Sequence, residues 1–495
     1  HVHVSEVGTA VGGGMGGMQN LRRIFRGRAQ EDPDMPSDSL QETFINSTAA
    51  WINMLLLSAA GPVKTPVGAC ATAAESVDVA VDTIQSGKAK IMLAGGVDDF
   101  GEEGSYEFAM MGATSDADAE AAMGREPGEM SRPMTTSRGG FMESHGAGVQ
   151  ILASAQTAID LGLPIYGIIA LSSTATDKEG RSVPAPGRGV LTTARENPAV
   201  ISRLPRPLLG IGVRKIRLMQ ELQHTAGIIA ADYAALDRHG YEDEEIAMLR
   251  DSLAREARMM VSDARRRWCL DWWKGDPGIS PLRGALATFG LSIDDVSFAS
   301  FHGTGTKAND TNESSVTHAQ FEHLGRSRGN PALVVAQKYL TGHPKGAAAA
   351  WMLNGVCQAL RDAVIPGNRN ADDIEPKLRH YSHLAFPNKS IRLADHPRAA
   401  LLKSFGFGQA GAEVLVIHPN LLLASLSPGD LASYKTRRAQ RERAAYRRHQ
   451  QVLSGEEYLL RVKHHPPWAE PDEEATYLNP AARAVQDPVT LEWTI

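Results

Sequence analysis

Cysteine is scarce in this chain of 495 residues, which contains three, at positions 70, 269 and 357. Their spacing fits neither a disulfide framework nor the paired ligands of a structural zinc site. The sequence therefore favours a reducing compartment and predicts no metal site. Because a lone cysteine is most often a small buried hydrophobe, a chemical role for any of the three has to be argued from its surroundings.

Long apolar stretches are also missing. There is no run of about 18 apolar residues and no signal peptide, so we expect no membrane association and a cytoplasmic protein. A formal net charge of -6 leaves no basic excess of the kind that nucleic-acid binding requires. The chain has no initiator methionine and opens on His1 in the middle of a pattern, so we expect it to be part of a longer protein.

The sequence does contain an alternation of apolar runs and helical stretches, which is typical of an α/β protein. Apolar runs at 90–96 and 164–173 predict buried strands, and residues 71–87 predict a helix with one apolar stripe. Further predicted strands lie at 296–303, 332–337, 399–408 and 412–419. The pattern of strand, turn and helix thus occurs in two halves.

Between these halves, dense charges at helical spacing without glycine-rich turns predict a helical insertion on the surface. After Pro419 the sequence predicts a basic helix and then an extended arm rich in proline and acidic residues. The predicted parts are a first half with the nucleophile at 1–199, the insertion at 200–275, a second half with two histidines at 276–420, and a basic helix with an assembly arm at 421–495.

One glycine motif is a poor guide to function. Gly12, Gly14 and Gly17 match the G-x-G-x-x-G pattern of dinucleotide-binding loops. A lone match is weak evidence, and no convincing ribose-binding acidic residue completes it. We interpret these glycines as positions where backbone and ligand approach closely.

Cys70 stands in the segment TPVGACATAAES (65–76), between a Pro/Gly turn and the first turn of a predicted helix. A helix N-terminus favours anions, so this position predicts a lowered thiol pKa. The small neighbours Gly68, Ala69 and Ala71 leave room for an acyl group on the sulfur. From these residues alone, a nucleophile and a structural thiol are equally good interpretations.

Two histidines favour the nucleophile. His302 follows a predicted strand in the turn FHGTGT, and His343 has the same relation to the next predicted strand, in YLTGHPKG. Because α/β folds build their sites in the loops beyond the carboxyl ends of strands, we expect both side chains to meet the Cys70 thiol in one cavity. Histidines outside such turns, for example His380 and His383, are interpreted as surface or structural residues.

Six separated segments resemble the β-ketoacyl synthase domain of the fungal type I fatty acid synthase α chain. They are VGACATAAES, EMSRPMTTSRGGFMESHGAG, ATDKEGRSVPAPGRGVLTTARE, SFHGTGTKANDTNE, KYLTGHPKGAAAAWM and SFGFGQAGAEVLVIHP. The resemblance covers about residues 8–419 and is weakest in the insertion. It implies a thiolase-type fold of two similar βαβαβ halves, with the opening strands of the first half absent from this chain.

The resemblance also implies roles for single residues. Cys70 would take an acyl group as a thioester. His302 and His343 would stabilise the enolate that forms when malonyl carrier protein loses carbon dioxide. Lys338 matches a lysine that orients this site and biases its protonation states. The backbone N–H groups of Cys70 and Phe407 would form the oxyanion hole.

Further positions match substrate-binding residues of the family; they are Met15, Phe44, Thr304, Thr306 and Gly406. Met15 lies in the GMGG turn and Phe44 precedes INSTAAW, and both positions border the acyl pocket in the family. Considered without the resemblance, Met15 and Phe44 would be interpreted as core residues.

The sequence departs from a thiolase in one respect, because its late glycine-rich loop, FGFGQAG, has no second catalytic cysteine. We interpret Cys269 and Cys357 as structural, and the pattern favours decarboxylative condensation over the reversible thiolase reaction. One alternative is the same condensation in a dedicated synthase of short starter acids for a polyketide pathway, which product chain length would distinguish. Another alternative, a catalytically silent scaffold, is disfavoured by the intact site.

The implied partners follow from this chemistry. An acyl carrier protein would deliver both substrates on its phosphopantetheine arm, and the domain itself would bind no cofactor. The resemblance further implies a homodimer of synthase domains within a larger assembly that includes a fatty acid synthase β subunit.

Overall fold

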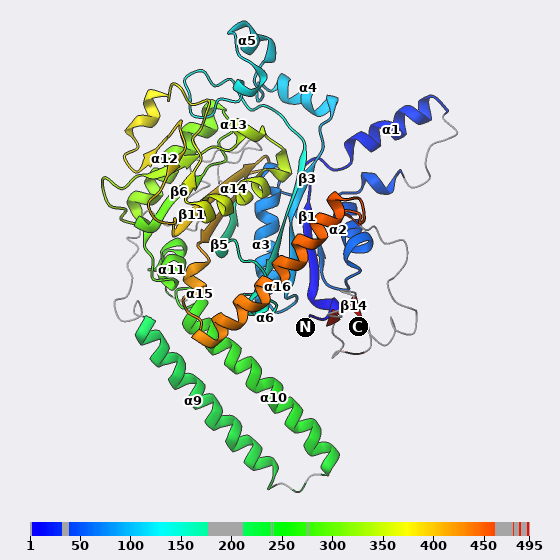
Figure 1. The fold of residues 1–495 in the computed structure, drawn as a ribbon, viewed down its shortest axis with the longest axis vertical. Coiled ribbons are helices and arrows are strands. Elements are labelled where there is room, and N and C mark those ends of the chain that lie inside the picture. Colours follow the sequence, from blue (N-terminus) through cyan, green and yellow to red (C-terminus); the bar gives the residue numbers. More distant parts are fainter. Residues whose placement is uncertain are drawn as a thin grey trace. The chain divides into compact units, whose positions relative to one another are not determined.

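The computed structural model divides the chain into two compact units (Figure 1). The described residues are 2–31, 39–176, 211–238, 240, 242–274, 276, 278–460, 479, 485–486 and 493–494. The first unit comprises His1–Ala194, Val296–Ala319 and Arg328–Ile495, and the second comprises Arg195–Asp295 and Gln320–Ser327. The segment ATDKEGRSVPAPGRGVLTTARE (175–196), one of the six that carry the family resemblance, lies largely outside the described residues. So does the predicted extended arm after residue 460.

The first unit contains a four-stranded sheet with the order β2-β1-β3-β4. Its strands are β1 (Val7–Gly12), β2 (Val63–Lys64), β3 (Ile91–Asp98) and β4 (Gly146–Ala153). The strands β2, β1 and β3 are parallel, and β4 is antiparallel to β3. The strand predicted at 90–96 is confirmed by β3, whose central place in the sheet explains its nearly continuous apolar run.

A second sheet in the same unit has six strands in the order β5-β12-β11-β6-β7-β9. They are β5 (Ile168–Ala175), β6 (Val296–Ser300), β7 (Ala332–Val335), β9 (Leu384–Ala385), β11 (Ala399–Gly406) and β12 (Ala410–Ile417). The neighbours β11, β6, β7 and β9 are parallel, whereas β12 is antiparallel to both β11 and β5. The predicted strand at 164–173 begins later, at Ile168, and is only half-buried because β5 is an edge strand.

Two helices, α3 (Thr72–Gln85) and α14 (Ala348–Asp362), pack between these two sheets. Their apolar faces place Val77, Ala80, Met352 and Val356 in one core with residues of both sheets. Burying each of the larger side chains contributes about 1.5–3 kcal/mol, and the many alanines let helix and strand backbones approach closely. This packing brings the turn before α3, residues 69–71, against the end of β11.

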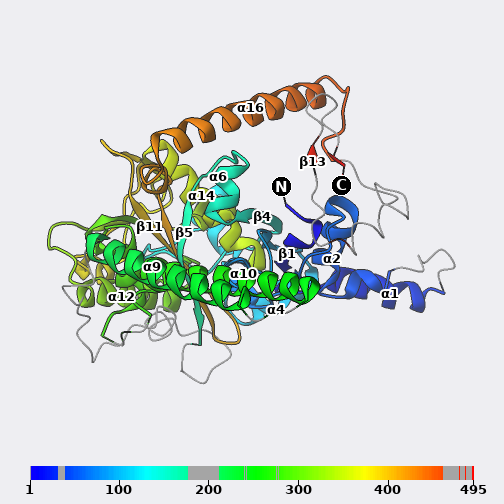
Figure 2. The same ribbon diagram turned by 90° about the horizontal axis from the view of Figure 1, so that it is seen from below.

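The other helices of this unit surround the core; those described are α1 (Met18–Ala29), α2 (Ser47–Ile52), α4 (Glu102–Met110), α5 (Ala117–Ala122), α6 (Ala155–Asp160), α12 (Lys307–His323, which ends in the second unit), α13 (Lys338–Thr341), α15 (Asn420–Leu423) and α16 (Pro428–Leu453). Figure 2 shows α16 as one long helix. This helix confirms the basic helix predicted after Pro419. It is tied to the unit where the Tyr434 hydroxyl donates to the Leu163 carbonyl oxygen at 2.9 Å.

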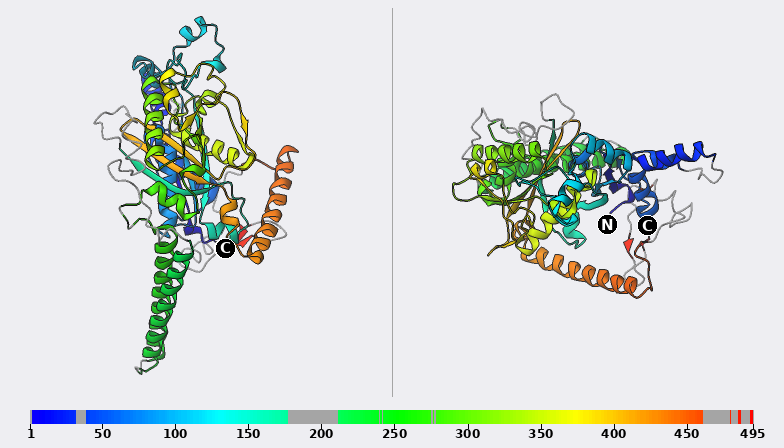
Figure 3. Two further views of the ribbon diagram at one scale, coloured as in Figure 1. Left: turned by 90° about the vertical axis from the view of Figure 1, so that its left-hand side faces the viewer. Right: turned by 90° about the horizontal axis from the view of Figure 1, so that it is seen from above.

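The second unit is dominated by a helical hairpin, defined here as α9 (Ile211–Leu236), α10 (Asp243–Arg265) and the π-helical turn η6 (Arg266–Leu270). Figure 3 shows the two long helices side by side. A further helix, α11 (Pro281–Thr288), follows. Among the helices that the structure describes, none combines the length and hydropathy that crossing a bilayer requires.

Candidate active site

The first component of the site is the turn that carries Cys70. This residue lies in η4 (Ala69–Ala71), which runs directly into α3. The Thr72 hydroxyl stabilises the turn, because it accepts a hydrogen bond from the Gly68 N–H at 3.0 Å and donates to the Ala69 carbonyl oxygen at 2.7 Å. Ala69 adopts a φ of +48°, in the strained left-handed region. Cys70 is thereby held at the start of the helix, only 6% exposed.

The lowered thiol pKa that the sequence predicts for Cys70 is wrong. Burial raises the pKa of Cys70 to about 12, and the nearby charge of Lys338 offsets only part of this effect. Desolvation disfavours a thiolate wherever no water or hydrogen-bond donor reaches the sulfur. Cys70 therefore rests as a neutral thiol.

His302 lies just beyond the carboxyl end of β6, as predicted. Its backbone N–H donates to Glu313 Oε1 at 2.8 Å, and the next N–H, of Gly303, donates to Glu313 Oε2 at 3.0 Å. One buried carboxylate on α12 thus fixes the turn that presents the imidazole. Burial raises the pKa of Glu313 to about 7, although the two backbone N–H groups lower it.

His343 occupies the matching turn after β7 and α13. Its backbone N–H donates to the Met142 carbonyl oxygen at 2.7 Å, which ties this turn to the first half of the unit. The two imidazoles meet edge to face, with 5.2 Å between the ring centroids of His302 and His343. Burial and the charge of Lys338 hold the pKa of each imidazole well below its ordinary value, so both rings are neutral at pH 7.

Lys338 orients the first of these rings. Its ammonium donates to the His302 carbonyl oxygen at 2.5 Å and lies 3.3 Å from His302 Nδ1. Because an ammonium only donates, Nδ1 accepts, and the single ring proton of His302 is assigned to Nε2. Burial lowers the pKa of Lys338 to about 8, although Glu313 raises it.

Ser404 on β11 connects Cys70 to His302, and the sequence analysis missed it. Its hydroxyl donates to the Cys70 carbonyl oxygen at 3.1 Å and lies 3.4 Å from His302 Nδ1. The sequence signal that could have identified Ser404 is a polar residue within a strand whose residues are all buried. Two residues further along, a Cβ on Gly406 would overlap the Gly68 carbonyl oxygen and lie 3.0 Å from the Cys70 nitrogen. Only glycine lets β11 approach Cys70 so closely.

Asp98, at the end of β3, was also missed. Its carboxylate accepts hydrogen bonds from the N–H groups of Gly14 at 2.9 Å, Met15 at 2.8 Å and Gly346 at 2.5 Å. It thus joins the glycine-rich turn after β1 to the turn that follows His343. A Cβ on Gly14 would lie 2.9 Å from this carboxylate, so that glycine of the G-x-G-x-x-G motif serves a contact within the protein.

Three further predicted site residues lie in turns next to residues already described. Phe407 directly follows Gly406 and its ring lies 6.0 Å from that of Phe108. Thr304 and Thr306 lie in the turn after His302, with 3.0 Å between their hydroxyl oxygens.

The two residues predicted to border the acyl pocket lie in different settings. Met15 is half-buried, and its methyl group would lie 3.1 Å from a Cβ on Gly104 of α4. Phe44, by contrast, is 51% exposed. It ends the short turn η2 (Gln41–Thr43), which packs against α1 and α2. The expectation that Phe44 would be a core residue without the resemblance is therefore wrong.

The other two cysteines have different surroundings. Burial raises the pKa of Cys357, on α14, to about 11, whereas Cys269 is exposed on η6 in the second unit. Within the described part of the chain, no cluster of three or more His, Cys, Asp or Glu side chains could hold a metal ion.

Comparison with known proteins gives the same fold and family for both halves of the site. The family description "Beta-ketoacyl synthase, N-terminal domain" matches residues 1–158, and "Beta-ketoacyl synthase, C-terminal domain" matches residues 274–372. The ketosynthase FabY from P. aeruginosa has a similar fold, with a TM-score of 0.68 and 19% identity over 100% of this chain and 64% of that one. This likeness confirms the predicted thiolase-type α/β class.

The fatty acid synthase subunit alpha of Lachancea kluyveri is 49% identical over 497 residues, which cover 99% of this chain and 26% of the relative. The same subunit of Saccharomyces cerevisiae is 48% identical over 494 residues, 98% of this chain and 26% of the relative. The chain thus spans about a quarter of the length of these curated relatives. Together these matches, over both catalytic halves, show that the chain belongs to the β-ketoacyl synthase family.

Proposed function

We propose that this chain is the condensing domain of a type I fatty acid synthase α chain and joins malonyl carrier protein to a Cys70-bound acyl group with loss of carbon dioxide. The observation that carries the proposal is the contact of one hydroxyl, that of Ser404, with both the Cys70 carbonyl oxygen and the ring of His302. Together with the 5.2 Å between the ring centroids of His302 and His343, this contact supports a nucleophile beside a pair of neutral imidazoles.

In the first half-reaction, the Cys70 sulfur attacks the thioester carbonyl of an acyl carrier protein. The new C–S bond forms as the phosphopantetheine sulfur leaves, and that sulfur takes the proton that Cys70 loses. The developing oxyanion accepts hydrogen bonds from the N–H groups of Cys70 and Phe407, which the close approach at Gly406 supports. Because the pKa of Cys70 is raised to about 12, the neutral thiol is the form that meets the substrate.

In the second half-reaction, the malonyl group loses carbon dioxide and the electron pair of the broken C–C bond forms an enolate. Neutral imidazoles suit this step, because His302 and His343 can donate N–H to the enolate oxygen without protonating its carbon. The enolate carbon attacks the Cys70 thioester, the C–S bond breaks, and the Cys70 sulfur regains a proton. The product is a β-ketoacyl group on the carrier protein.

The same proposal assigns the remaining predicted site residues. Thr304 and Thr306 would hold the phosphopantetheine arm beside the histidines, Gly406 would leave room for the thioester, and Met15 and Phe44 would border the acyl chain. Asp98 supports the placement of Met15, because it holds the backbone of that turn. The exposure of Phe44 fits a wall completed by a second copy of the domain.

The wider setting is likewise proposed. An acyl carrier protein would supply both substrates, the domain itself would bind no cofactor, and the site would lie in a cytoplasmic homodimer within an assembly with a β subunit. The exposed edge strand β2 and the exposed Trp51 and Met54 nearby support such a dimer.

We keep the boundaries proposed from the sequence, with the catalytic halves at 1–199 and 276–420. The relatives named above are fatty acid synthase α subunits, which favours this reading over a starter-acid synthase.

An acyl-chain epoxide such as cerulenin tests the assignment of the nucleophile. We expect stoichiometric modification at Cys70 with loss of condensation, because the acyl-like chain of the epoxide resembles the acyl group that Cys70 is proposed to carry. Peptide mass spectrometry locates the modified residue. Cys269→Ser is the matched control and should label as the parent does, although Cys269 is the exposed thiol. Epoxide found on Cys269 or Cys357 in place of Cys70 would overturn the assignment.

The pH dependence of decarboxylation tests the role of Lys338. Its pKa of about 8 predicts that the rate falls as pH rises through 8, because the ammonium that sets the His302 tautomer loses its proton. Glu313, Cys70 and Asp310 also face this ammonium, and a Lys338 variant distinguishes its titration from theirs. Carbon dioxide release from malonyl carrier protein gives the profile. Lys338→Arg should move the alkaline limb to higher pH, and an unmoved limb would contradict the assignment.

A further inference from the structure

The helical hairpin of the second unit is divided by charge along its length. Its tip, residues 230–251, carries seven carboxylates and two arginines, a net charge of -5. Its base, residues 211–229 and 252–270, carries eight basic side chains and three carboxylates, a net charge of +5. The hairpin is therefore an electric dipole with two nearly balanced ends.

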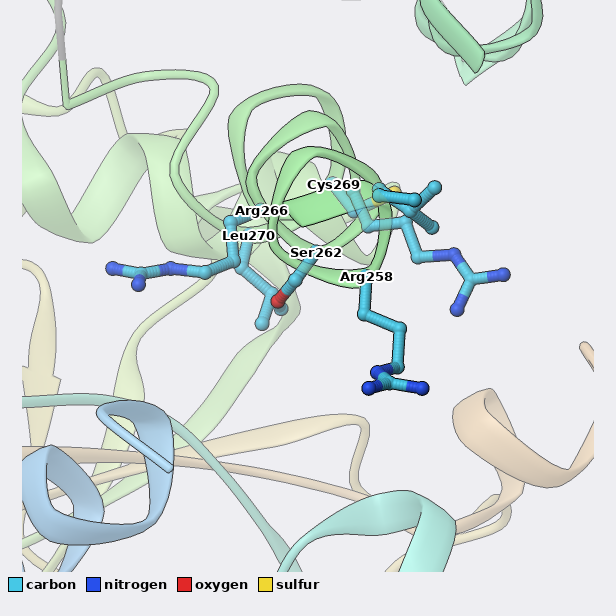
Figure 4. Close-up of a pocket in the computed structure, with 8 residues that line it drawn as sticks. Arg258, Ser262, Arg266, Cys269 and Leu270 are labelled. Atoms are coloured by element: carbon cyan, nitrogen blue, oxygen red, sulfur yellow. The ribbon is translucent and has the colours of Figure 1, made fainter. Parts of the chain in front are cut away.

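The basic end also contains a hollow. A space of about 480 Å³ opens along α10 and η6, between Arg258, Arg265 and Arg266 (Figure 4). Val261 and Leu270 supply apolar surface to it. Arg266 pairs with Asp271 at 3.2 Å, whereas Arg258 and Arg265 have no ion pair among the residues that the structure describes.

The hairpin exposes apolar side chains that its own two helices do not cover. Met219 on α9 and Met248 and Met259 on α10 are each more than three-fifths exposed. Met248 and Met259 are 11 residues apart, about three helical turns, so they lie on one face of α10. Two helices bury only part of an apolar surface of this kind, which is commonly completed by a second helical pair.

We infer that this hairpin packs against the hairpin of a second copy of the chain, tip to base, in an antiparallel four-helix arrangement. Glu244 and Glu245 of one copy would face Arg258 and Arg265 of the other, and Met248 would enter the hollow. A two-fold axis makes both ends of the contact equivalent. The acidic tip of each copy therefore pairs with the basic base of the other copy. This inference does not depend on the proposed condensation reaction.

Charge complementarity favours an antiparallel second hairpin over other binding partners of this surface. A parallel pairing would place tip against tip and base against base, with like charges facing each other. An acidic partner of another kind, or an anionic lipid surface, would match the base but would be repelled by the tip. Exposed ion pairs contribute little each, so the charges fix the direction of pairing while the methionines supply most of the affinity.

Disulfide formation in the full chain tests the arrangement. Cys269 lies at the base and is exposed, whereas Cys70 is buried and Cys357 is partly buried. Positions 244 and 269 are 25 residues apart along nearly continuous helix, about 35 Å, so a disulfide between them can join only two copies. We expect Glu244→Cys to shift the chain from monomer to covalent dimer on non-reducing gels after mild oxidation, and the shift to be lost when Cys269→Ser is added.

Glu456→Cys, an exposed glutamate outside the hairpin, is the control and should give no such dimer. The charge-reversal pair Arg258→Glu and Arg265→Glu should reduce the yield of covalent dimer, and adding Glu245→Arg should restore part of it. Equal dimer yields from positions 244 and 456, a disulfide between the Cys269 residues of two copies, or no dimer at all would each overturn the inference. Condensation activity is measured separately, so a failure here is distinguishable from a failure of the proposed function.

Discussion

Replacing Cys70 by alanine should separate the two half-reactions, with acyl transfer lost and malonyl decarboxylation retained. Acyl transfer needs a sulfur to form the covalent intermediate, so we expect a loss of at least about 10⁴-fold in this step. Decarboxylation should continue at a comparable rate, because the proposed donors for the enolate are His302 and His343, which the variant keeps. Transfer of a radiolabelled acyl group to the protein and release of carbon dioxide from malonyl carrier protein measure the two steps independently.

The variant is expected to fold, because alanine removes only the sulfur and keeps the Cys70 carbonyl oxygen that accepts from Ser404 at 3.1 Å. Cys357→Ala is the matched control, since Cys357 is the other cysteine whose thiol pKa is raised by burial. It should leave both half-reactions intact. Retention of acyl transfer by the Cys70→Ala chain would show that the nucleophile lies elsewhere.

Replacing either imidazole should give the opposite profile. For His302→Ala and His343→Ala we expect decarboxylation to fall about 10²–10³-fold, the usual cost of removing one donor to a developing oxyanion. Acylation of Cys70 should persist, because the proposed oxyanion hole for that step consists of backbone N–H groups. The turn at position 302 keeps its support, since Glu313 accepts from the backbone and not from the imidazole.

Two further variants test whether the loss of decarboxylation depends on the N–H donors of the two histidines. His302→Gln keeps an N–H donor in the same place and should recover part of the decarboxylation that alanine loses. His383→Ala removes a buried histidine of the same unit that lies outside the site, and it should not alter the balance between the two half-reactions. Identical profiles for Cys70→Ala, His302→Ala and His343→Ala would contradict the division of roles.

Several features of the site could be predicted from the sequence because their causes are local. The Pro/Gly turn and the alanine-rich stretch after it place Cys70 at the start of α3. Strands β6 and β7 are short apolar runs followed by glycine turns, which is how the positions of His302 and His343 were found. Strand direction and turn position depend on residues within a few places of each other, and a sequence displays these directly.

Other features depend on residues far apart in the chain, and no local pattern announces them. Ser404 reaches a carbonyl oxygen 334 residues away, and Asp98 binds a backbone N–H 248 residues away. The pKa of Cys70 is the clearest example, because a helix N-terminus predicts a lowered value while burial between two sheets raises it to about 12. The order of residues along the chain is thus enough to name the candidate reacting groups. Their solvation and their positioning partners arise only when packing excludes water and brings distant segments together.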